Sequence, residues 1–214
     1  MAYFPFYIDI SNQACLVVGG GIVALRKIEV LLEFEVKIIV ITPTIREEIY
    51  MLKAEAEKKG KEQIIIKERE FEDGDINGIQ FVIAATSDEL LNSHISEFCK
   101  QNNIMVNVVD VKEECSFIFP AILKMDELVV AVSTGGNSPA LAAKIKQDIR
   151  KSIPDYYGEL IELLGEYREY IKEEVLVPKY RKQVYNELIN LADYYKRNLT
   201  KEELISVVKK YKDL

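Results

Sequence analysis

The feature that most constrains this chain is a run of apolar residues that ends in a glycine-rich turn. Residues 14–18 read as a buried strand, and Gly19-x-Gly21-x-x-Ala24 follows them at the start of an amphipathic helix. Gly19 permits a tight turn, Gly21 lets the backbone approach a phosphate because no Cβ intervenes, and Ala24 keeps the helix close to the strand. The free N–H groups and positive dipole end of such a helix stabilise an anion. The spacing therefore predicts a site for a dinucleotide pyrophosphate and points to a redox cofactor.

Strand and helix patterns alternate through the first half of the chain. Such alternation favours a parallel, doubly wound sheet of the α/β class. The expected strands are Leu16–Val18, Val36–Ile41, Gln63–Ile66, Phe81–Ala85 and Ile104–Val109. The expected helices between them are Val23–Phe34, Thr44–Lys59 and Ser87–Gln101, with Ser87 as the N-cap of the last.

The pattern changes after Asp110. Ser116–Lys124 and Glu127–Ser133 are β-rich runs on either side of a polar turn, which predicts a hairpin or paired strands outside the parallel sheet. A helix follows to about Ser152, and the remainder reads as helical with a break at Val177-Pro178. We therefore expect three parts, a nucleotide-binding domain, a small β-rich region and a helical domain, over residues 1–112, 113–150 and 151–214.

Composition narrows the class of protein. The chain has 214 residues, of which 49% are hydrophobic, and this is ample for a folded core. A net charge of −7 argues against a nucleic-acid-binding protein. The three cysteines show no CxxC pair and read as free thiols in a reducing compartment, and the single histidine, His94, offers no ready-made metal site. Because no signal peptide and no run of 18 apolar residues is visible, we expect a soluble cytoplasmic protein without a membrane segment.

Several further strings occur in order along the chain. They are Val17-Val-Gly-Gly-Gly-Ile-Val-Ala-Leu-Arg-Lys27, Ala84-Ala-Thr86, Asn92, Val106-Asn-Val-Val-Asp110, Phe117-Ile-Phe-Pro-Ala-Ile122 and Ser133-Thr-Gly-Gly-Asn-Ser-Pro-Ala-Leu141. Over roughly residues 3–150 the chain resembles the precorrin-2 dehydrogenase family, including the N-terminal module of siroheme synthase. The C-terminal part resembles the family only in being helical.

The resemblance implies a fold, an activity and a partner. The implied fold is a Rossmann domain followed by a small β-rich dimerisation region and a C-terminal helical domain, assembled as a homodimer. The implied activity is the oxidation of precorrin-2 to sirohydrochlorin with NAD as hydride acceptor. Some members of the family also insert ferrous iron to give siroheme, so a bifunctional dehydrogenase and ferrochelatase is one alternative. A non-catalytic NAD-sensing regulatory module is the alternative from another class.

The residues expected to bind the cofactor follow the first, second and fourth strands. The glycines hold the pyrophosphate, and the first helical residues offer backbone N–H groups. By resemblance, residues after the second strand flank the adenosine and those after the fourth line the nicotinamide half. The set is Gly19, Gly20, Gly21, Ile22, Val23, Pro43, Thr44, Ala84, Ala85, Thr86 and, on the fifth strand, Asn107.

The end of the second strand lacks the acid that usually grips the adenosine ribose of NAD. Ile41-Thr-Pro43-Thr44 stands in that place. Because no carboxylate repels a 2′-phosphate there and Arg46 is near, the choice between NAD and NADP stays open.

Asp110 is the catalytic candidate. It follows the fifth strand, at the carboxyl edge where open sheets keep their ligands, and the resemblance places the key aspartate of the family here. A carboxylate at that place can take the proton that leaves the macrocycle or orient the ring. The structural alternative is an ordinary turn or N-cap aspartate.

A second glycine-containing turn precedes the helix that ends near Ser152. Ser138 suits an N-cap and Pro139 the first helical position, so the turn can bind a carboxylate arm of a tetrapyrrole or serve as a plain cap. Lys144 adds positive potential, and Arg26 and Lys27 after the first glycine turn are either anion-binding or solvated. The predicted substrate-binding set is Thr134, Gly135, Gly136, Asn137, Ser138 and Lys144.

Overall fold

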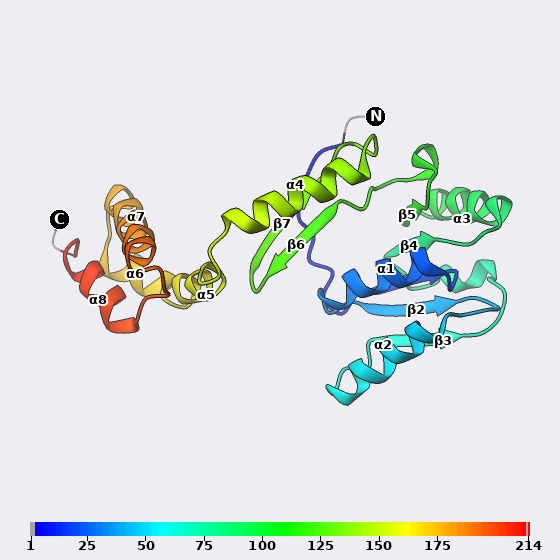
Figure 1. Ribbon diagram of the computed structural model, residues 1–214, viewed down its shortest axis with the longest axis horizontal. Helices are drawn as coiled ribbons and strands as arrows, with labels where there is room; N and C mark the ends of the chain where they lie inside the picture. Colours follow the sequence, from blue (N-terminus) through cyan, green and yellow to red (C-terminus); the bar gives the residue numbers. More distant parts are fainter. Residues whose placement is uncertain (1–2, 213) are drawn as a thin grey trace. The chain divides into compact units, whose positions relative to one another are not determined.

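The structure is a computed structural model that describes residues 3–212 and Leu214 (Figure 1). The chain folds into two compact units. One contains the residues up to Pro120 together with Ser133–Ser138, and the other contains Ala121–Val132 together with Pro139–Leu214. The chain therefore leaves the first unit after Pro120, returns to it for a short turn, and leaves it again at Pro139.

A parallel sheet forms the centre of the first unit. Within the described residues it has five strands in the order β3-β2-β1-β4-β5, all parallel to their neighbours. The register pairs Val18, the last residue of β1, with Ile41 of β2 and Ala84 of β4, so these three strands end at one level. The predicted parallel α/β sheet is confirmed. Its strands are β1 (Ala14–Val18), β2 (Lys37–Ile41), β3 (Ile64–Lys67), β4 (Phe81–Ala84) and β5 (Met105–Val108).

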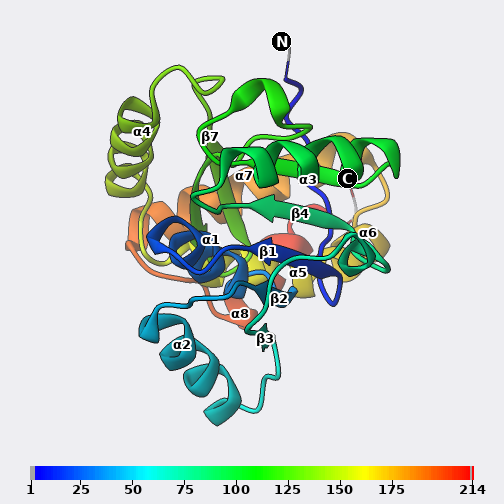
Figure 2. The same cartoon turned by 90° about the vertical axis from the view of Figure 1, so that its right-hand side faces the viewer.

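Helices cover both faces of this sheet, because alternate residues of each strand point to opposite sides. Cys15 and Val17 of β1 pack in one core with α1 (Ile22–Leu32) and α2 (Glu47–Lys58). Leu16 and Val18 pack in a second core with α3 (Glu89–Gln101). In Figure 2, α3 and α2 lie on opposite sides of β1 and β4. Two short 3₁₀ helices, η1 (Asp73–Ile76) and η2 (Lys112–Glu114), lie in the connections before β4 and after β5.

The second unit combines a strand pair with helices. The strands β6 (Ala121–Met125) and β7 (Leu128–Val132) are antiparallel, as the sequence predicts, and α4 (Pro139–Ser152) packs against both. The remaining helices enclose a separate core that includes Leu160, Ile171, Val184 and Leu188. They are α5 (Tyr157–Glu166), α6 (Arg168–Glu174), α7 (Pro178–Tyr195) and α8 (Lys201–Lys209), and α7 starts at the expected break.

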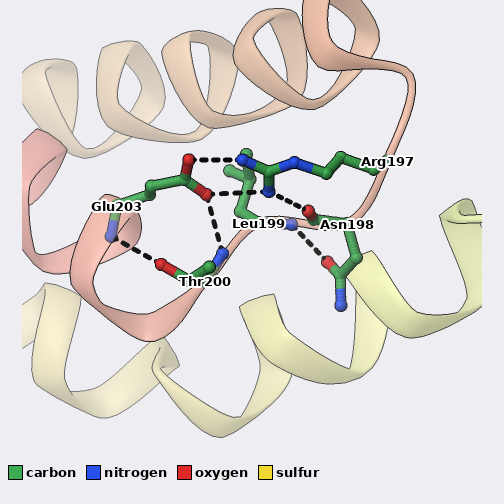
Figure 3. A network of polar contacts seen from close by, with 5 residues as sticks. All are labelled: Arg197, Asn198, Leu199, Thr200 and Glu203. Carbon is green, nitrogen blue, oxygen red and sulfur yellow. Dashed lines mark hydrogen bonds and ion pairs between the residues drawn. The ribbon is translucent and has the colours of Figure 1, made fainter.

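A reciprocal capping arrangement fixes the start of α8 (Figure 3). The Thr200 side chain accepts a hydrogen bond from the Glu203 backbone N–H at 3.3 Å, and the Glu203 carboxylate accepts one from the Thr200 N–H at 2.8 Å. Arg197 donates two hydrogen bonds to the same carboxylate, at 2.7 and 3.0 Å. The turn from α7 into α8 is therefore held by side chains at its surface as well as by the core.

Two local expectations are wrong. The predicted strand Ser116–Lys124 begins only at Ala121, and Ser116 is instead tied to β5, where it accepts from the Val106 N–H through its Oγ at 2.7 Å. The N-cap of α3 is Asp88, which accepts from the Leu91 N–H at 3.1 Å, and not Ser87. Thr86 Oγ1 accepts from the Asp88 N–H at 3.1 Å and so shifts the start of the helix by one residue.

None of the helices in the described part of the chain combines the length and the apolar character that crossing a bilayer requires.

Candidate functional site

A pocket of about 530 Å³ opens at the carboxyl ends of β1, β2 and β4, within the first unit. This is the edge at which open parallel sheets bind ligands, and the volume is that of a small-molecule site. The pocket contains most of the residues predicted to bind the cofactor. Its wall consists of Val18, Gly19, Gly20, Gly21, Ile41, Thr42, Pro43, Thr44, Ile45, Arg46, Glu70, Phe71, Ala85, Thr86, Ser87, Asp88 and Leu91.

The three glycines of the turn have different reasons to be glycine. A Cβ on Gly19, which has a φ of 116°, would lie 2.3 Å from the Ala85 carbonyl oxygen. A Cβ on Gly20 would lie 2.6 Å from the Thr44 carbonyl oxygen. No described atom lies within 4 Å of a Cβ on Gly21, apart from its chain neighbours and its own helix. Gly19 and Gly20 are therefore required by the packing of the protein, whereas the space beside Gly21 is open to a ligand.

The start of α1 fits a phosphate. Gly21 is its N-cap, and among the described residues neither a capping side chain nor an acid in the first turn meets its N–H groups. In contrast, α3 is capped by Asp88 and α8 by Thr200. Uncapped N–H groups and a positive dipole end favour an anion, so the residues present fit the pyrophosphate of a dinucleotide. Ile22 and Val23 occupy this first turn, as predicted.

The loop after β2 is fixed against the glycine turn. The Arg46 backbone N–H donates to the Gly20 carbonyl at 3.1 Å. The buried Thr42 hydroxyl donates to the Thr44 carbonyl at 2.7 Å. Pro43 and Thr44 are exposed on the pocket wall, where the predicted adenosine contacts require them.

The loop after β4 is held by Asn92 of α3, which is buried. Its Oδ1 accepts from the Thr86 hydroxyl at 2.8 Å, and its Nδ2 donates to the Thr86 carbonyl at 3.1 Å. Ala85 and Thr86 line the pocket, whereas Ala84 is buried in the sheet. Asn92 is therefore a positioning residue for the wall of the pocket.

Asn107 lies away from this pocket. Its side chain is buried and donates to the Phe117 carbonyl at 3.0 Å, so it fastens the segment after β5 to the strand. Cys115 acts in the same place, where its Sγ accepts from the Val108 N–H at 3.1 Å. The two side chains shape the loop that contains Asp110.

Asp110 follows β5 and is exposed, with a φ of 63° in the left-handed region that aspartate tolerates better than most residues. It does not line the 530 Å³ pocket. The half-buried Lys27 of α1 lies near it. Burial lowers the pKa of the Lys27 ammonium, and negative charge on Cys115 or Asp110 opposes that shift. The structure therefore brings a cation of the first glycine helix to the loop of the predicted catalytic acid.

The turn Ser133–Ser138 is closed by its own side chains. The Thr134 hydroxyl donates to the Ser138 carbonyl and accepts from the Ser138 N–H, both at 3.0 Å. Gly135 and Gly136 have φ values of 63° and 84°, and a Cβ on Gly136 would lie 3.3 Å from the Lys112 side chain. This turn therefore lies beside the segment that follows Asp110.

Lys144 lies on α4 in the second unit and pairs with Asp148 at 2.6 Å. Within the described residues, no group of three His, Cys, Asp or Glu side chains could hold a metal ion. His94 is exposed and its Nε2 lies 2.7 Å from an Asp73 carboxylate oxygen. The three cysteines are free and buried.

The residues at these sites that sequence reasoning did not assign to them include Glu70, Phe71 and Lys112. Glu70 and Phe71 line the pocket from the loop after β3, and Lys112 contacts the second glycine turn. The available signal for the first two was their place after a predicted strand of the same parallel sheet. Lys112 gave a weaker signal, since only its closeness in sequence to Asp110 marks it.

Comparisons with known proteins agree with this architecture. Residues 6–121 match the model of a family described as putative NAD(P)-binding, and residues 127–152 match one described as sirohaem biosynthesis protein central. The siroheme synthase of Thioalkalivibrio sulfidiphilus is 40% identical over 189 residues, which is 88% of this chain and 37% of that protein. The siroheme synthase of Pseudomonas aeruginosa strain PAO1 is 41% identical over 173 residues, which is 81% of this chain and 36% of that protein.

The chain thus spans about a third of the length of these curated relatives. A solved structure entitled SirC, precorrin-2 dehydrogenase, superimposes with a TM-score of 0.71 at 29% identity and covers 98% of this chain and 100% of that one. These matches confirm the resemblance expected from the sequence. The chain belongs to the putative NAD(P)-binding family whose model spans its parallel sheet.

Proposed function

We propose that this chain is an NAD-dependent dehydrogenase that oxidises precorrin-2 to sirohydrochlorin. The observation that carries the proposal is the arrangement of the first unit. A pocket with an open glycine turn lies at the ends of β1, β2 and β4, and Asp110 follows β5, the strand next to β4. The similarity to SirC, precorrin-2 dehydrogenase, over nearly the whole chain supports the same activity.

Each wall of the pocket has a role toward the coenzyme. The N–H groups at the start of α1 bind the pyrophosphate, and Gly21 leaves them accessible. Pro43 and Thr44 flank the adenosine, and Ala85 and Thr86 border the nicotinamide half. When bound, NAD supplies a hydride acceptor at its nicotinamide ring.

Asp110 receives the proton. The oxidation removes a hydride and a proton from the reduced macrocycle, so a base must lie near the carbon or nitrogen that loses the proton. The Asp110 carboxylate is exposed on the loop after β5 and can accept it. Lys27, close enough to interact with this carboxylate, keeps positive charge beside it.

Cations and open backbone near Asp110 suit a substrate with many carboxylate arms. Arg26 is exposed on α1, and Lys112 lies between Asp110 and the Gly135-Gly136 turn. A carboxylate arm can bind the ammonium of Lys112 and the amides of that turn together. The homodimer and the insertion of ferrous iron as a second substrate remain predictions from the resemblance, and the cytoplasmic location remains a prediction from the sequence.

The test is turnover with purified protein. NAD and precorrin-2 are expected to give the absorption spectrum of sirohydrochlorin together with NADH, in equal amounts. Asp110→Asn should keep NAD affinity and lower kcat by about 10²–10⁴-fold, the range for a lost general base. Retention of full turnover by Asp110→Asn would remove the aspartate from the mechanism, and NAD binding without any turnover by the native chain would favour the NAD-sensing module.

A further inference from the structure

We propose that Glu70, together with the Arg46–Glu48 ion pair, sets the preference of this chain for NAD over NADP. The inference rests on the proposed function only in taking the 530 Å³ pocket as the coenzyme site. Arg46 and Glu70 line this pocket after β2 and β3, on the side where the proposed function places the adenosine ribose. The usual determinant, an acid at the end of β2, is absent here, so another group must make the choice.

Arg46 is the cation that a 2′-phosphate would need. It lines the pocket after β2, but its Nη2 lies 2.5 Å from the Glu48 carboxylate. The hydrogen bond to Glu48 raises the pKa of Arg46, and the same bond lowers the pKa of Glu48, so the two groups carry opposite charges at neutral pH. The Glu48 carboxylate therefore offsets part of the positive charge that Arg46 presents to a phosphate.

The Arg46 backbone is also fixed. Its N–H donates to the Gly20 carbonyl at 3.1 Å, which ties it to the turn that binds the pyrophosphate. A 2′-phosphate that binds Arg46 would therefore compete with the Glu48 carboxylate for the guanidinium and would lie close to that negative charge.

Glu70 supplies a carboxylate from the opposite loop. It lines the same pocket and is exposed, and within the described residues its carboxylate has no hydrogen-bond or ion-pair partner. Its backbone is held in place, because Arg69 donates to the Glu70 carbonyl at 2.8 Å and also to Asp75. A carboxylate so placed can accept a hydrogen bond from a ribose hydroxyl and repels a phosphate at the same position.

The remaining charged side chain of the wall does not restore a positive site. Asp88 lines the pocket after β4, and its carboxylate accepts from the Leu91 N–H as the cap of α3. Among the described residues, the charged side chains that line the pocket are thus one arginine and two acids, and the arginine is paired with a third acid outside the wall. A dinucleotide with an extra phosphate dianion meets a net negative rim.

The experiment is equilibrium titration of the native chain with NAD and with NADP, without macrocycle, at low salt. We expect NAD to bind about tenfold more tightly, since several rim charges of one sign act together at short range. Glu70→Gln should bring the two affinities closer by at least about threefold, the scale of one exposed charge pair. Glu48→Gln should do so as well by releasing Arg46 to the 2′-phosphate.

Glu55→Gln is the matched control, because Glu55 lies on α2 and pairs with Lys59, outside the pocket. It should leave the ratio of affinities unchanged, and 0.5 M salt should reduce the ratio of the native chain. Equal affinity for both dinucleotides, or an unchanged ratio of affinities in both Glu70→Gln and Glu48→Gln while NAD still binds, would overturn the selectivity and leave the proposed function standing. Failure of both dinucleotides to bind the native chain would overturn the proposed function itself, and the selectivity with it.

Discussion

The ammonium nitrogen of Lys27 lies 4.0 Å from the centroid of the Phe119 ring. Lys27 belongs to α1, the helix that follows the first glycine turn, and Phe119 belongs to the segment after β5. The contact therefore joins the helix of the coenzyme pocket to the segment that contains Asp110. An ammonium over an aromatic ring stays charged in a half-buried place more readily than over an aliphatic surface.

Replacing Lys27 with methionine should separate its electrostatic role from its packing. Burial lowers the pKa of Lys27 below its ordinary 10.5, so the folded chain binds fewer protons there than the unfolded chain between the two values. The stability of the native chain should therefore rise, relative to Lys27→Met, as pH increases toward 10.5. At pH 7 the two free energies of unfolding should agree within about 1 kcal/mol, since the lost ring contact offsets the relieved burial.

Urea unfolding of both chains at pH 7 and pH 10 measures this effect, and the exposed Lys58→Met is the control. A difference in free energy of unfolding between the native chain and Lys27→Met that is constant with pH, or that falls as pH rises, would contradict the prediction. Turnover of Lys27→Met should fall, because the positive charge beside Asp110 is gone.

The glycine turn should respond differently at its two ends. Gly21→Ala is expected to change the free energy of unfolding by less than about 1 kcal/mol, since its Cβ meets open space. NAD affinity should nevertheless fall at least about tenfold, because the methyl group occupies the approach of the phosphates. Gly19→Ala should destabilise the chain by more than about 2 kcal/mol, since it adds a backbone clash at a positive φ.

Thermal melts and NAD titration check both variants. Gly165→Ala is the control, because Gly165 lies in α5 and its Cβ also meets open space. A Gly21→Ala chain that binds NAD normally would remove the turn from the phosphate site.

Asp75 should matter for the loop that contains Glu70 and Phe71. It accepts two hydrogen bonds from Arg69 and one from the Glu72 N–H. Asp75→Asn should lower the free energy of unfolding by about 2 kcal/mol, the scale of charge-assisted hydrogen bonds. Arg69 lowers the pKa of Asp75 below its ordinary 3.8, so this stabilisation is present above 3.8 and is lost as pH falls through the lower, folded-state value.

Denaturant titrations between pH 2 and pH 7 measure this loss of stability, with Glu97→Gln, an exposed acid on α3, as the control. The native chain should approach the variant in stability at the acid end. If the difference in free energy of unfolding between the native chain and Asp75→Asn is as large at pH 2 as at pH 7, the ionised Arg69–Asp75 pair is not the source of that difference.

Removing the Thr134 hydroxyl should weaken binding of the macrocycle and leave the affinity for NAD unchanged. This hydroxyl closes the turn by hydrogen bonds to the backbone carbonyl and the backbone N–H of Ser138. Thr134→Val should cost about 1–2 kcal/mol of stability and raise KM for precorrin-2, whereas Thr134→Ser keeps the hydroxyl and both properties. NAD affinity serves as the internal reference. A Thr134→Val chain with native KM would assign the turn to capping alone.

The sequence predicted the sheet and the glycine turn because both depend on local patterns. Apolar β-branched runs and a glycine spacing describe β1 and α1 without knowledge of the rest of the chain. The start of α3 was missed by one residue, since Ser87 and Asp88 are both good caps and only the bond from Asp88 to Thr86 decides between them.

Other features depend on contacts between distant segments. Asn107 was expected in the cofactor site, yet its amide donates to Phe117, ten residues away in sequence. Glu70 was not expected there, because the β3 loop reaches the pocket only through the strand order of the folded sheet. Local spacing carries no information about either contact.

Gly20 lies so close to the Thr44 carbonyl, and Gly19 to the Ala85 carbonyl, that three loops of the pocket touch through bare main chain. Under the proposed function, the main chain that would receive the diphosphate is closely packed before any ligand arrives, so little ordering entropy would be lost on binding. Almost no substitution is tolerated at Gly19 and Gly20, because any Cβ there would clash with backbone atoms. Adaptation to a different dinucleotide is then confined to the outer side chains, so natural variation in coenzyme preference should concentrate at the rim while the turn beneath stays invariant.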